Sequence, residues 1–137
     1  MEPILHLSIP VSDLAEARAF YVDVLGCTPG RSREGWIDVW FFGLQLTLQE
    51  RPEQVLDAEQ VGVRHFGATL DRAALRSLVE VAEAADVDWL HRLSTDHAGT
   101  PLEQTKAKLR DPSGNVIELK AYADPATALE QLGLVDR

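Results

Sequence analysis

Two histidines occupy matching places in two stretches of this chain, and this repetition constrains the fold more than any other feature. His6 lies in the apolar segment 4–9 and His65 in the apolar segment 63–68, and each segment predicts a short strand. Each strand is soon followed by an aspartate that starts an amphipathic helix. A polar residue between apolar neighbours faces the opposite side of a sheet. We therefore expect a duplicated unit whose halves share a polar site.

The first half is predicted to contain one helix and two further strands. A helix over 13–25 begins with an aspartate that resembles the start of a capping box, and it ends at Gly26. Strands follow over 36–42 and 44–49. The second of these strands alternates most clearly, so one of its sides is polar. Its apolar side consists of Leu44, Leu46 and Leu48, and its polar side of Gln45, Thr47 and Gln49.

The second half repeats this plan after a polar connection over 51–62. A helix begins after Asp71, with apolar residues spaced as on one helix face. The order of strands and helices favours the α+β class over a parallel doubly wound sheet. We expect one domain over 1–123 with two modules, about 1–52 and 61–123, and a helical tail over 124–137. The remaining predicted elements are a strand over 87–91, a loop over 94–103, strands over 106–110 and 116–122, and a turn over 111–115 between them.

Composition narrows the classes of function open to the chain. Its 137 residues make one ordinary domain. A net charge of −9 and a pI of about 4.8 argue against nucleic acid or an anionic membrane as a partner. The single cysteine, Cys27, excludes an internal disulfide. Because there is neither a signal peptide nor an apolar stretch of about 20 residues, we expect a cytoplasmic protein.

A carboxylate in the last predicted strand completes a candidate metal site. Glu118 lies between Ile117 and Leu119, and a carboxylate in a sheet is costly unless it is paired, wet or bound to metal. Together with His6 and His65 it offers two imidazoles and one carboxylate. This set suits Fe(II) with open coordination positions, and it also suits Zn, Ni or Mn. We therefore expect a divalent metal ion as cofactor.

Three segments carry a resemblance to a known family. They are His6–Leu14 (HLSIPVSDL), Phe20–Gly26 (FYVDVLG) and Asp111–Leu119 (DPSGNVIEL). The chain resembles the vicinal oxygen chelate superfamily, which includes glyoxalase I, extradiol dioxygenases, fosfomycin-resistance proteins and bleomycin-binding proteins. The resemblance implies two βαβββ modules whose mixed sheet forms a metal-lined cup. It also places His6, His65 and Glu118 on the family's ligand positions.

The resemblance is incomplete at other site positions. Glyoxalase I has a glutamate in the last strand of its first module, where this chain offers Gln45 as a further candidate ligand. The remaining two histidines and one glutamate are the extradiol pattern. Extradiol enzymes, however, have a tyrosine where this chain has Lys108, and no histidine lies near Gln49. Lys108 and Gln49, which stand at these two places, are the candidate catalytic residues. The candidate substrate pocket consists of Thr47, Trp40 and Lys120.

These observations predict a metal-dependent enzyme of the glyoxalase or dioxygenase type. Its substrate would be a small molecule with two adjacent oxygens, and its reaction that of a lyase, an isomerase or a ring-cleaving dioxygenase. One alternative is a non-catalytic protein that sequesters a small molecule, as bleomycin-resistance proteins do, and another is a thiol transferase of the fosfomycin type. We also expect a homodimer, from the family's habits and the aromatic strand 36–42. The site lies either within one chain or between two.

Overall fold

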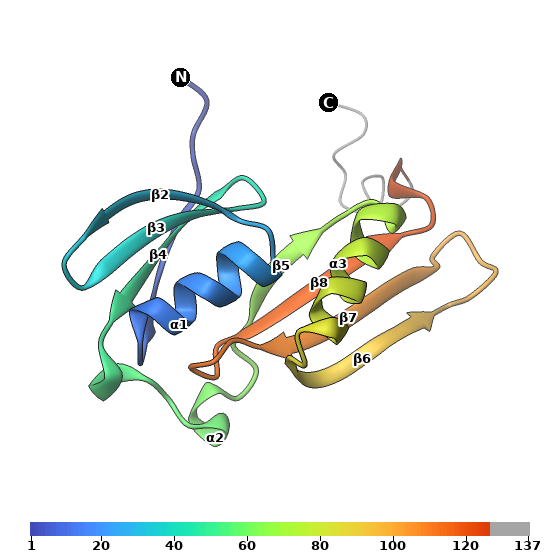
Figure 1. Cartoon of the computed structure of the whole chain (residues 1–137). Coiled ribbons are helices and arrows are strands. Elements are labelled where there is room, and N and C mark those ends of the chain that lie inside the picture. The colour runs from blue at the N-terminus through green and yellow to red at the C-terminus, as the bar shows by residue number, and fades with distance from the viewer. Residues whose placement is uncertain (127–137) are drawn as a thin grey trace.

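The computed structural model of the chain describes residues 1–126 as two modules of the same construction (Figure 1). Each module holds a four-stranded mixed sheet and one long helical segment, which confirms the predicted α+β class with βαβββ modules. Apart from its first residues, the tail helix predicted over 124–137 lies outside the described residues. Among those described, no helix has the length and hydrophobicity of a membrane span.

Module 1 is built around a sheet of strand order β1-β4-β3-β2. Strand β1 runs parallel to β4, and the other neighbours are antiparallel. Asp13 accepts a hydrogen bond from the Glu16 backbone N–H at 2.8 Å, which caps the helix as its sequence predicts. The elements are β1 (His6–Val11), α1 (Leu14–Arg18), the π-helical continuation η1 (Ala19–Val24), β2 (Thr28–Arg33), β3 (Trp36–Phe41) and β4 (Leu44–Glu50).

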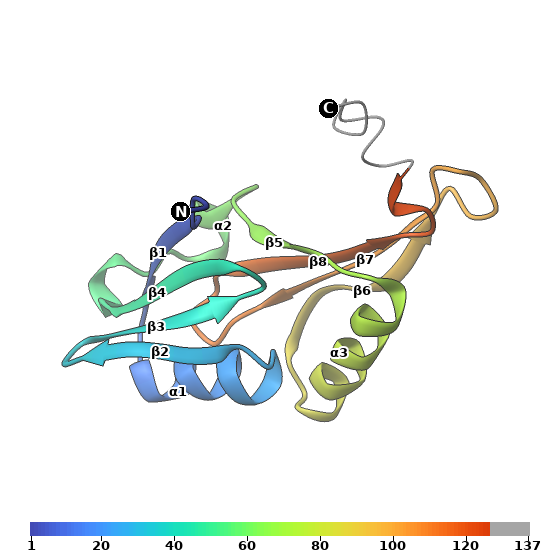
Figure 2. The same cartoon turned by 90° about the horizontal axis from the view of Figure 1, so that it is seen from above.

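Module 2 repeats this topology with the strand order β5-β8-β7-β6. Strand β5 runs parallel to β8, just as β1 does to β4. In Figure 2, α1 lies against one face of the first sheet and α3 against one face of the second. The connecting elements are η2 (Pro52–Gln54) and α2 (Ala58–Val61), and the module itself consists of β5 (Phe66–Thr69), α3 (Arg72–Ala84), β6 (Asp88–Asp96), β7 (Gln104–Arg110) and β8 (Val116–Tyr122).

A single hydrophobic core joins the two modules. It contains Tyr21 and Phe41 from module 1 together with Leu109 and Ile117 from module 2, all but fully buried. Burying a side chain of this size stabilises the fold by about 1.5–3 kcal/mol. On β4 and β8 the core-facing residues alternate with polar ones, so each sheet has an apolar face toward its helix and a polar face on the other side.

The turn over 111–115 fastens module 2 to module 1 by direct hydrogen bonds. Tyr21 Oη donates to Asp111 Oδ2 at 2.8 Å inside the core. The backbone N–H of Ser12 donates to Ser113 Oγ at 2.8 Å, and Asn115 Nδ2 donates to the Pro10 carbonyl at 3.1 Å. The structure confirms the predicted turn and shows that it also connects the modules. We call these three hydrogen bonds the clasp.

Most predicted elements are confirmed, but the polar connection over 51–62 contains the short helices η2 and α2, and the structure also differs from the prediction elsewhere. Strand β2 was not predicted, because its sequence TPGRSR is exposed throughout and contains a proline and a glycine. Strand β6 extends to Asp96, through the start of the predicted loop over 94–103. His6 is the first residue of β1, and His65 directly precedes β5, so neither histidine lies in the middle of a strand.

Candidate metal site

Two of the three predicted ligands meet on the polar face of module 2. His65 Nε2 lies 3.0 Å from Glu118 Oε2, and the two side chains are 37% and 18% exposed. The other ring nitrogen, Nδ1, lies 2.8 Å from the Val63 carbonyl oxygen. A carbonyl only accepts hydrogen bonds, so Nδ1 carries the proton and Nε2 of the neutral ring turns a lone pair toward the carboxylate.

Two acceptors this close repel each other unless a cation lies between them or the ring takes a second proton. A divalent ion fits the same geometry, because two ligand atoms at about 2.1 Å from one ion and at right angles lie about 3.0 Å apart. A hydrogen bond from Nδ1 to a carbonyl is also the usual outer contact of a metal-bound histidine. The pair is therefore suited to half of a metal site.

A glycine brings the two strands of this pair together. Gly67 pairs with Glu118 between β5 and β8. A Cβ atom at Gly67 would lie 1.7 Å from the Glu118 backbone oxygen, far inside van der Waals contact. Only glycine permits this approach, and the approach places His65, two residues earlier, beside the Glu118 side chain.

His6 does not join this pair within one chain. In residues 1–126 no three His, Cys, Asp or Glu side chains of a single chain are grouped closely enough to hold an ion. His6 lies on module 1, in a hollow of about 270 Å³ on the polar face of its own sheet. The residues around that hollow are His6, Arg31, Trp36, Asp38, Thr47 and Gln49.

Strand pairing identifies the matching positions of the two modules. Ser8 of β1 pairs with Thr47, and Gly67 of β5 pairs with Glu118. We match His6 with His65, as the sequence suggests, and Ser8 and Gly67, each two residues later, are then matched as well. Thr47 is then the counterpart of Glu118. Gln45, our candidate for a further ligand, pairs with His6 itself.

A buried carboxylate governs the polar side chains of module 1. Asp38 is 3% exposed. Thr47 Oγ1 donates to its Oδ1 at 2.6 Å, and Gln45 Nε2 donates to its Oδ2 at 3.1 Å. Arg31 adds two hydrogen bonds to Oδ2, from Nε at 3.0 Å and Nη2 at 2.9 Å. Burial raises the pKa of Asp38, but the hydrogen bonds from Thr47, Gln45 and Arg31 outweigh it, and the pKa lies below the ordinary value.

The sequence did not single out this Asp38 cluster, although it contained a signal. Asp38 stands between Ile37 and Val39 in an apolar strand, as Glu118 stands between Ile117 and Leu119. The same cost of a buried carboxylate applies to both. Which cation satisfies Asp38 could not be predicted, because Arg31 belongs to the strand that the sequence did not reveal.

The other predicted site residues divide between the two polar faces. Lys108 pairs with Glu118 across β7 and β8, and Lys120 lines a hollow of about 270 Å³ beside His65 and Glu118. Gln49 Nε2 donates to Ser8 Oγ at 2.5 Å, at the His6 hollow. Trp40 is 40% exposed on the same face as Asp38. Cys27 is buried, and burial raises the pKa of its thiol to about 12, which favours the protonated thiol over the nucleophilic thiolate near neutral pH.

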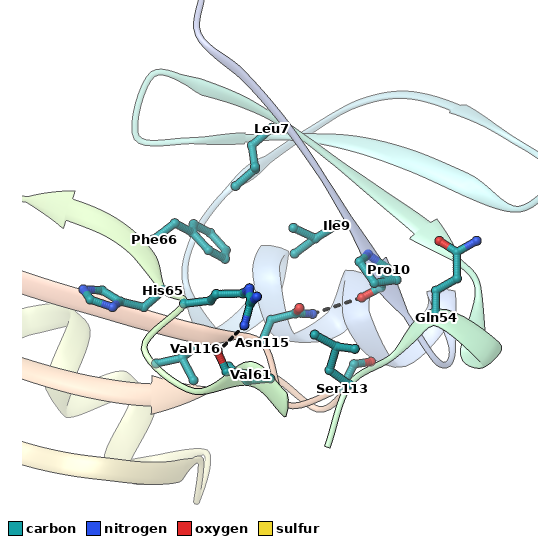
Figure 3. A pocket seen from close by; sticks show the side chains of 12 residues that line it. Leu7, Ile9, Pro10, Gln54, Val61, His65, Phe66, Ser113, Asn115 and Val116 are labelled. Carbon is teal, nitrogen blue, oxygen red and sulfur yellow. Dashed lines mark hydrogen bonds between the residues drawn. The ribbon is translucent and has the colours of Figure 1, made fainter. Parts of the chain in front are cut away.

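A larger pocket of about 450 Å³ lies between the modules, with His65 at its edge (Figure 3). Its wall is mainly apolar, whereas the hollow of Glu118 and Lys120 is polar. Because His65 borders both, the candidate metal pair stands next to room for an apolar group. The pocket is lined by Leu7, Ile9, Pro10, Gln54, Leu56, Val61, Arg64, His65, Phe66, Ser113, Asn115 and Val116.

A comparison with known protein families agrees with this architecture. The chain belongs to the Glyoxalase/Bleomycin resistance protein/Dioxygenase superfamily, whose family model matches residues 3–119. This confirms the resemblance inferred from the sequence. A comparison with curated proteins finds no match.

Solved structures agree with the family. A glyoxalase/bleomycin resistance protein/dioxygenase from Alicyclobacillus acidocaldarius is 34% identical, with a TM-score of 0.77 over 91% of this chain and 95% of that one. The fosfomycin resistance protein FosX from Listeria monocytogenes is 14% identical, with a TM-score of 0.73 over 93% and 98%. A lactoylglutathione lyase from Agrobacterium tumefaciens is 22% identical, with a TM-score of 0.63 over 88% and 94%. The latter two share the fold.

Proposed function

We propose that this protein is a metal-dependent enzyme whose site forms between two copies of the chain. The observation that carries the proposal is the pair of His65 Nε2 and Glu118 Oε2, two acceptors held 3.0 Å apart with no proton between them in the neutral state. His6 of a second copy supplies the third ligand. The complete set of two histidines and one glutamate suits Fe, Mn, Ni or Zn and leaves coordination positions open.

The edges of both sheets support assembly from two copies. Within the described residues, β1 and β5 each pair with a strand on one side only. Large apolar side chains stand exposed just before them: Leu5 at 72% and Val63 at 91%. An open strand edge next to exposed apolar residues is a pairing surface. If β1 of one copy meets β5 of another, His6 approaches His65 and Glu118, so the predicted homodimer and the metal site are one proposal.

Register favours a centre with three protein ligands over one with four. The counterpart of Glu118 in module 1 is Thr47, whose hydroxyl already donates to Asp38. The amide nitrogen of Gln45 donates to the same carboxylate, so only its carbonyl oxygen remains available. Neither residue adds a negative charge. A centre with open positions can accept two neighbouring oxygens of a small substrate. Three protein ligands therefore favour a dioxygenase-like centre over the four-ligand centre of glyoxalase I.

The chain's own residues have separable tasks in such a site. A bound divalent ion would act as a Lewis acid on two adjacent substrate oxygens. Lys120 lines the same hollow as Glu118, with Nζ 5.7 Å from the centre of the Tyr122 ring, and its ammonium group can hold an anionic oxygen there. Lys108 lies across from Glu118 on the next strand and is the candidate proton donor of module 2. The apolar pocket beside His65 accommodates the rest of the substrate and excludes water from it.

Metal analysis of protein purified without a histidine tag tests the proposal. The protein is stripped with a chelator, reloaded separately with Fe(II), Mn, Ni and Zn, and analysed for bound metal. We expect one ion per chain. Loaded protein is then assayed for oxygen uptake with catechols and for isomerisation of the thiohemiacetals of 2-oxoaldehydes. Failure to retain any of the four metals would mean that the second proton, and no ion, reconciles His65 with Glu118. Stoichiometric metal without turnover would favour the non-catalytic binding protein.

A further inference from the structure

We propose that the substrate carries an anionic group, a carboxylate, phosphate or phosphonate, and that Arg31 binds it. This rests on the proposed function, because it names the substrate class of the same site. The residue lies on β2, in the hollow that also contains His6. Its side chain is 71% exposed although its partner Asp38 is buried.

A bulge in β2 directs Arg31 into this hollow. Pro29 pairs with Val39 and Ser32 with Ile37, so two residues of β2, Gly30 and Arg31, stand opposite the single residue Asp38. Such a bulge redirects a side chain, and bulges recur beside functional sites. Gly30 makes room for it, since a Cβ atom there would lie 3.3 Å from the Asp38 Cβ.

Two contacts hold the guanidinium group and leave part of it free. Nε and Nη2 both donate to Asp38 Oδ2, and Cζ lies 5.6 Å from the centre of the Trp36 ring. A guanidinium group has five N–H donors. Two of them are used in these hydrogen bonds, and within residues 1–126 the structure gives the other three no protein acceptor. A planar group fixed in this way is ready to bind an oxyanion with little loss of side-chain entropy.

The other polar side chains around Asp38 do not compete for an anion. The Thr47 hydroxyl and the Gln45 amide point their donors at Asp38, and Gln49 points its amide at Ser8. Arg31 is therefore the strongest donor that this wall offers to an anion, because it is charged and three of its N–H groups are unused within the described residues. The protein as a whole carries a net charge of −9, so it attracts anions only where cations are fixed locally. Lys120 on the other module adds a second cation if the two faces meet.

Calorimetric titration with inorganic phosphate tests the proposal, with acetate as a second probe. A parallel titration follows the fluorescence of Trp36 after Trp40 and Trp89 are replaced by phenylalanine. We expect saturable binding that Arg31→Gln weakens at least about tenfold, as loss of a hydrogen bond to a charged group implies. The matched control is Arg33→Gln. Arg33 stands on the same strand, opposite Trp36, and donates to the Ser32 carbonyl at 2.9 Å, so its loss is expected to change binding less than about twofold.

A second variant separates binding from the neutralisation of Asp38. Arg31→Gln leaves a buried carboxylate without its cation, and the double variant with Asp38→Asn removes both charges. If Arg31 only neutralised Asp38, the single variant would lose stability, the double variant would regain it, and phosphate binding would stay unchanged in both; that result overturns the proposal, as does wild-type protein that binds neither probe. Arg31→Gln is expected to keep its full metal content. Phosphate binding at Arg31 in a wild-type protein that holds no metal would reject the proposed function and leave only the anion site at Arg31 standing.

Discussion

The polar faces of the two modules differ most at one register position. Module 2 has Glu118 on its last strand with Lys108 across from it, and module 1 has Thr47 with Asp38 across from it. The carboxylate therefore stands on the last strand, β8, in module 2, but on the strand next to the last, β3, in module 1. Within residues 1–126, the Glu118 side chain has one short-range partner, the His65 Nε2, whereas Asp38 accepts four hydrogen bonds from three side chains. A carboxylate whose oxygens accept several hydrogen bonds orients the side chains around it. A carboxylate with few hydrogen-bond partners keeps lone pairs that can bind an ion. We propose that the duplicated unit has separated into a half that supplies two metal ligands and a half that supplies one ligand and substrate contacts.

Replacing the residue at this register position, Glu118 in module 2 and Thr47 in module 1, is expected to give the largest contrast. Glu118→Ala removes an acceptor that we assign to the metal, so bound metal should fall to background while the fold remains. The stability of the variant should equal or exceed that of metal-free wild type, because a partly buried carboxylate and its repulsion of the neutral His65 ring are gone. Thr47→Val in module 1 should keep the metal and cost about 1–2 kcal/mol, since Asp38 loses a donor. Metal analysis and urea unfolding measure both. Tight metal binding in Glu118→Ala would show that the carboxylate is structural.

Gly67 of β5, at the close approach of this strand to β8, provides the next contrast. In Gly67→Ala the new Cβ meets the Glu118 backbone, so the strands must separate, at a cost of at least about 2 kcal/mol. His65 then moves away from Glu118, and metal affinity drops. Ser8→Ala changes the matching residue of module 1 and should cost less than about 1 kcal/mol. Comparable losses of stability and metal in the two variants would contradict the role of Gly67.

The clasp between the modules is expected to contribute a smaller effect. Tyr21→Phe removes the phenolic donor to the buried Asp111, which should destabilise the fold by about 1–3 kcal/mol. Tyr122→Phe, a change of the same kind at a half-buried position on β8, should cost about 0.5 kcal/mol or less. Thermal or urea unfolding of the two variants measures the difference. Equal stability of both would mean that the Tyr21 hydroxyl does not hold the modules together.

The pKa of Asp111, which accepts the hydrogen bond from Tyr21, is expected to show the smallest effect of the clasp. Burial raises the pKa of its carboxyl above the ordinary 3.8, against hydrogen bonds from Asn115, Tyr21 and Ser113 that lower it. Because the folded pKa is the higher one, the contribution of Asp111 to stability is fully present below about pH 3.8 and is lost as the pH rises through the folded pKa. Tyr21→Phe should raise the pKa further. NMR titration of the Asp111 carboxyl carbon checks both statements, and a pKa below 3.8 would refute them.

Sequence patterns predicted the fold well where residues alternate or follow helical periodicity. The alternating leucines predicted strand β4, and the apolar residues at helical spacing predicted helix α3. Strand β2 escaped prediction because pairing with β3, and not its own composition, makes TPGRSR extended. The same missing strand concealed Arg31 and its contact with Asp38. The correspondence of Thr47 with Glu118 also depends on register, which side-chain patterns alone leave uncertain by two residues.

A mixed dimer tests the shared metal site most directly. His6→Ala and Glu118→Ala chains are produced together with two different tags, neither of them polyhistidine, and the dimer carrying both tags is isolated and loaded with metal. If each site joins His6 of one copy to His65 and Glu118 of the other, one of the two sites in the mixed dimer is fully wild type. We therefore predict one metal ion per mixed dimer and none in either variant alone. A mixed dimer without metal, or a variant that retains its metal by itself, would contradict the account.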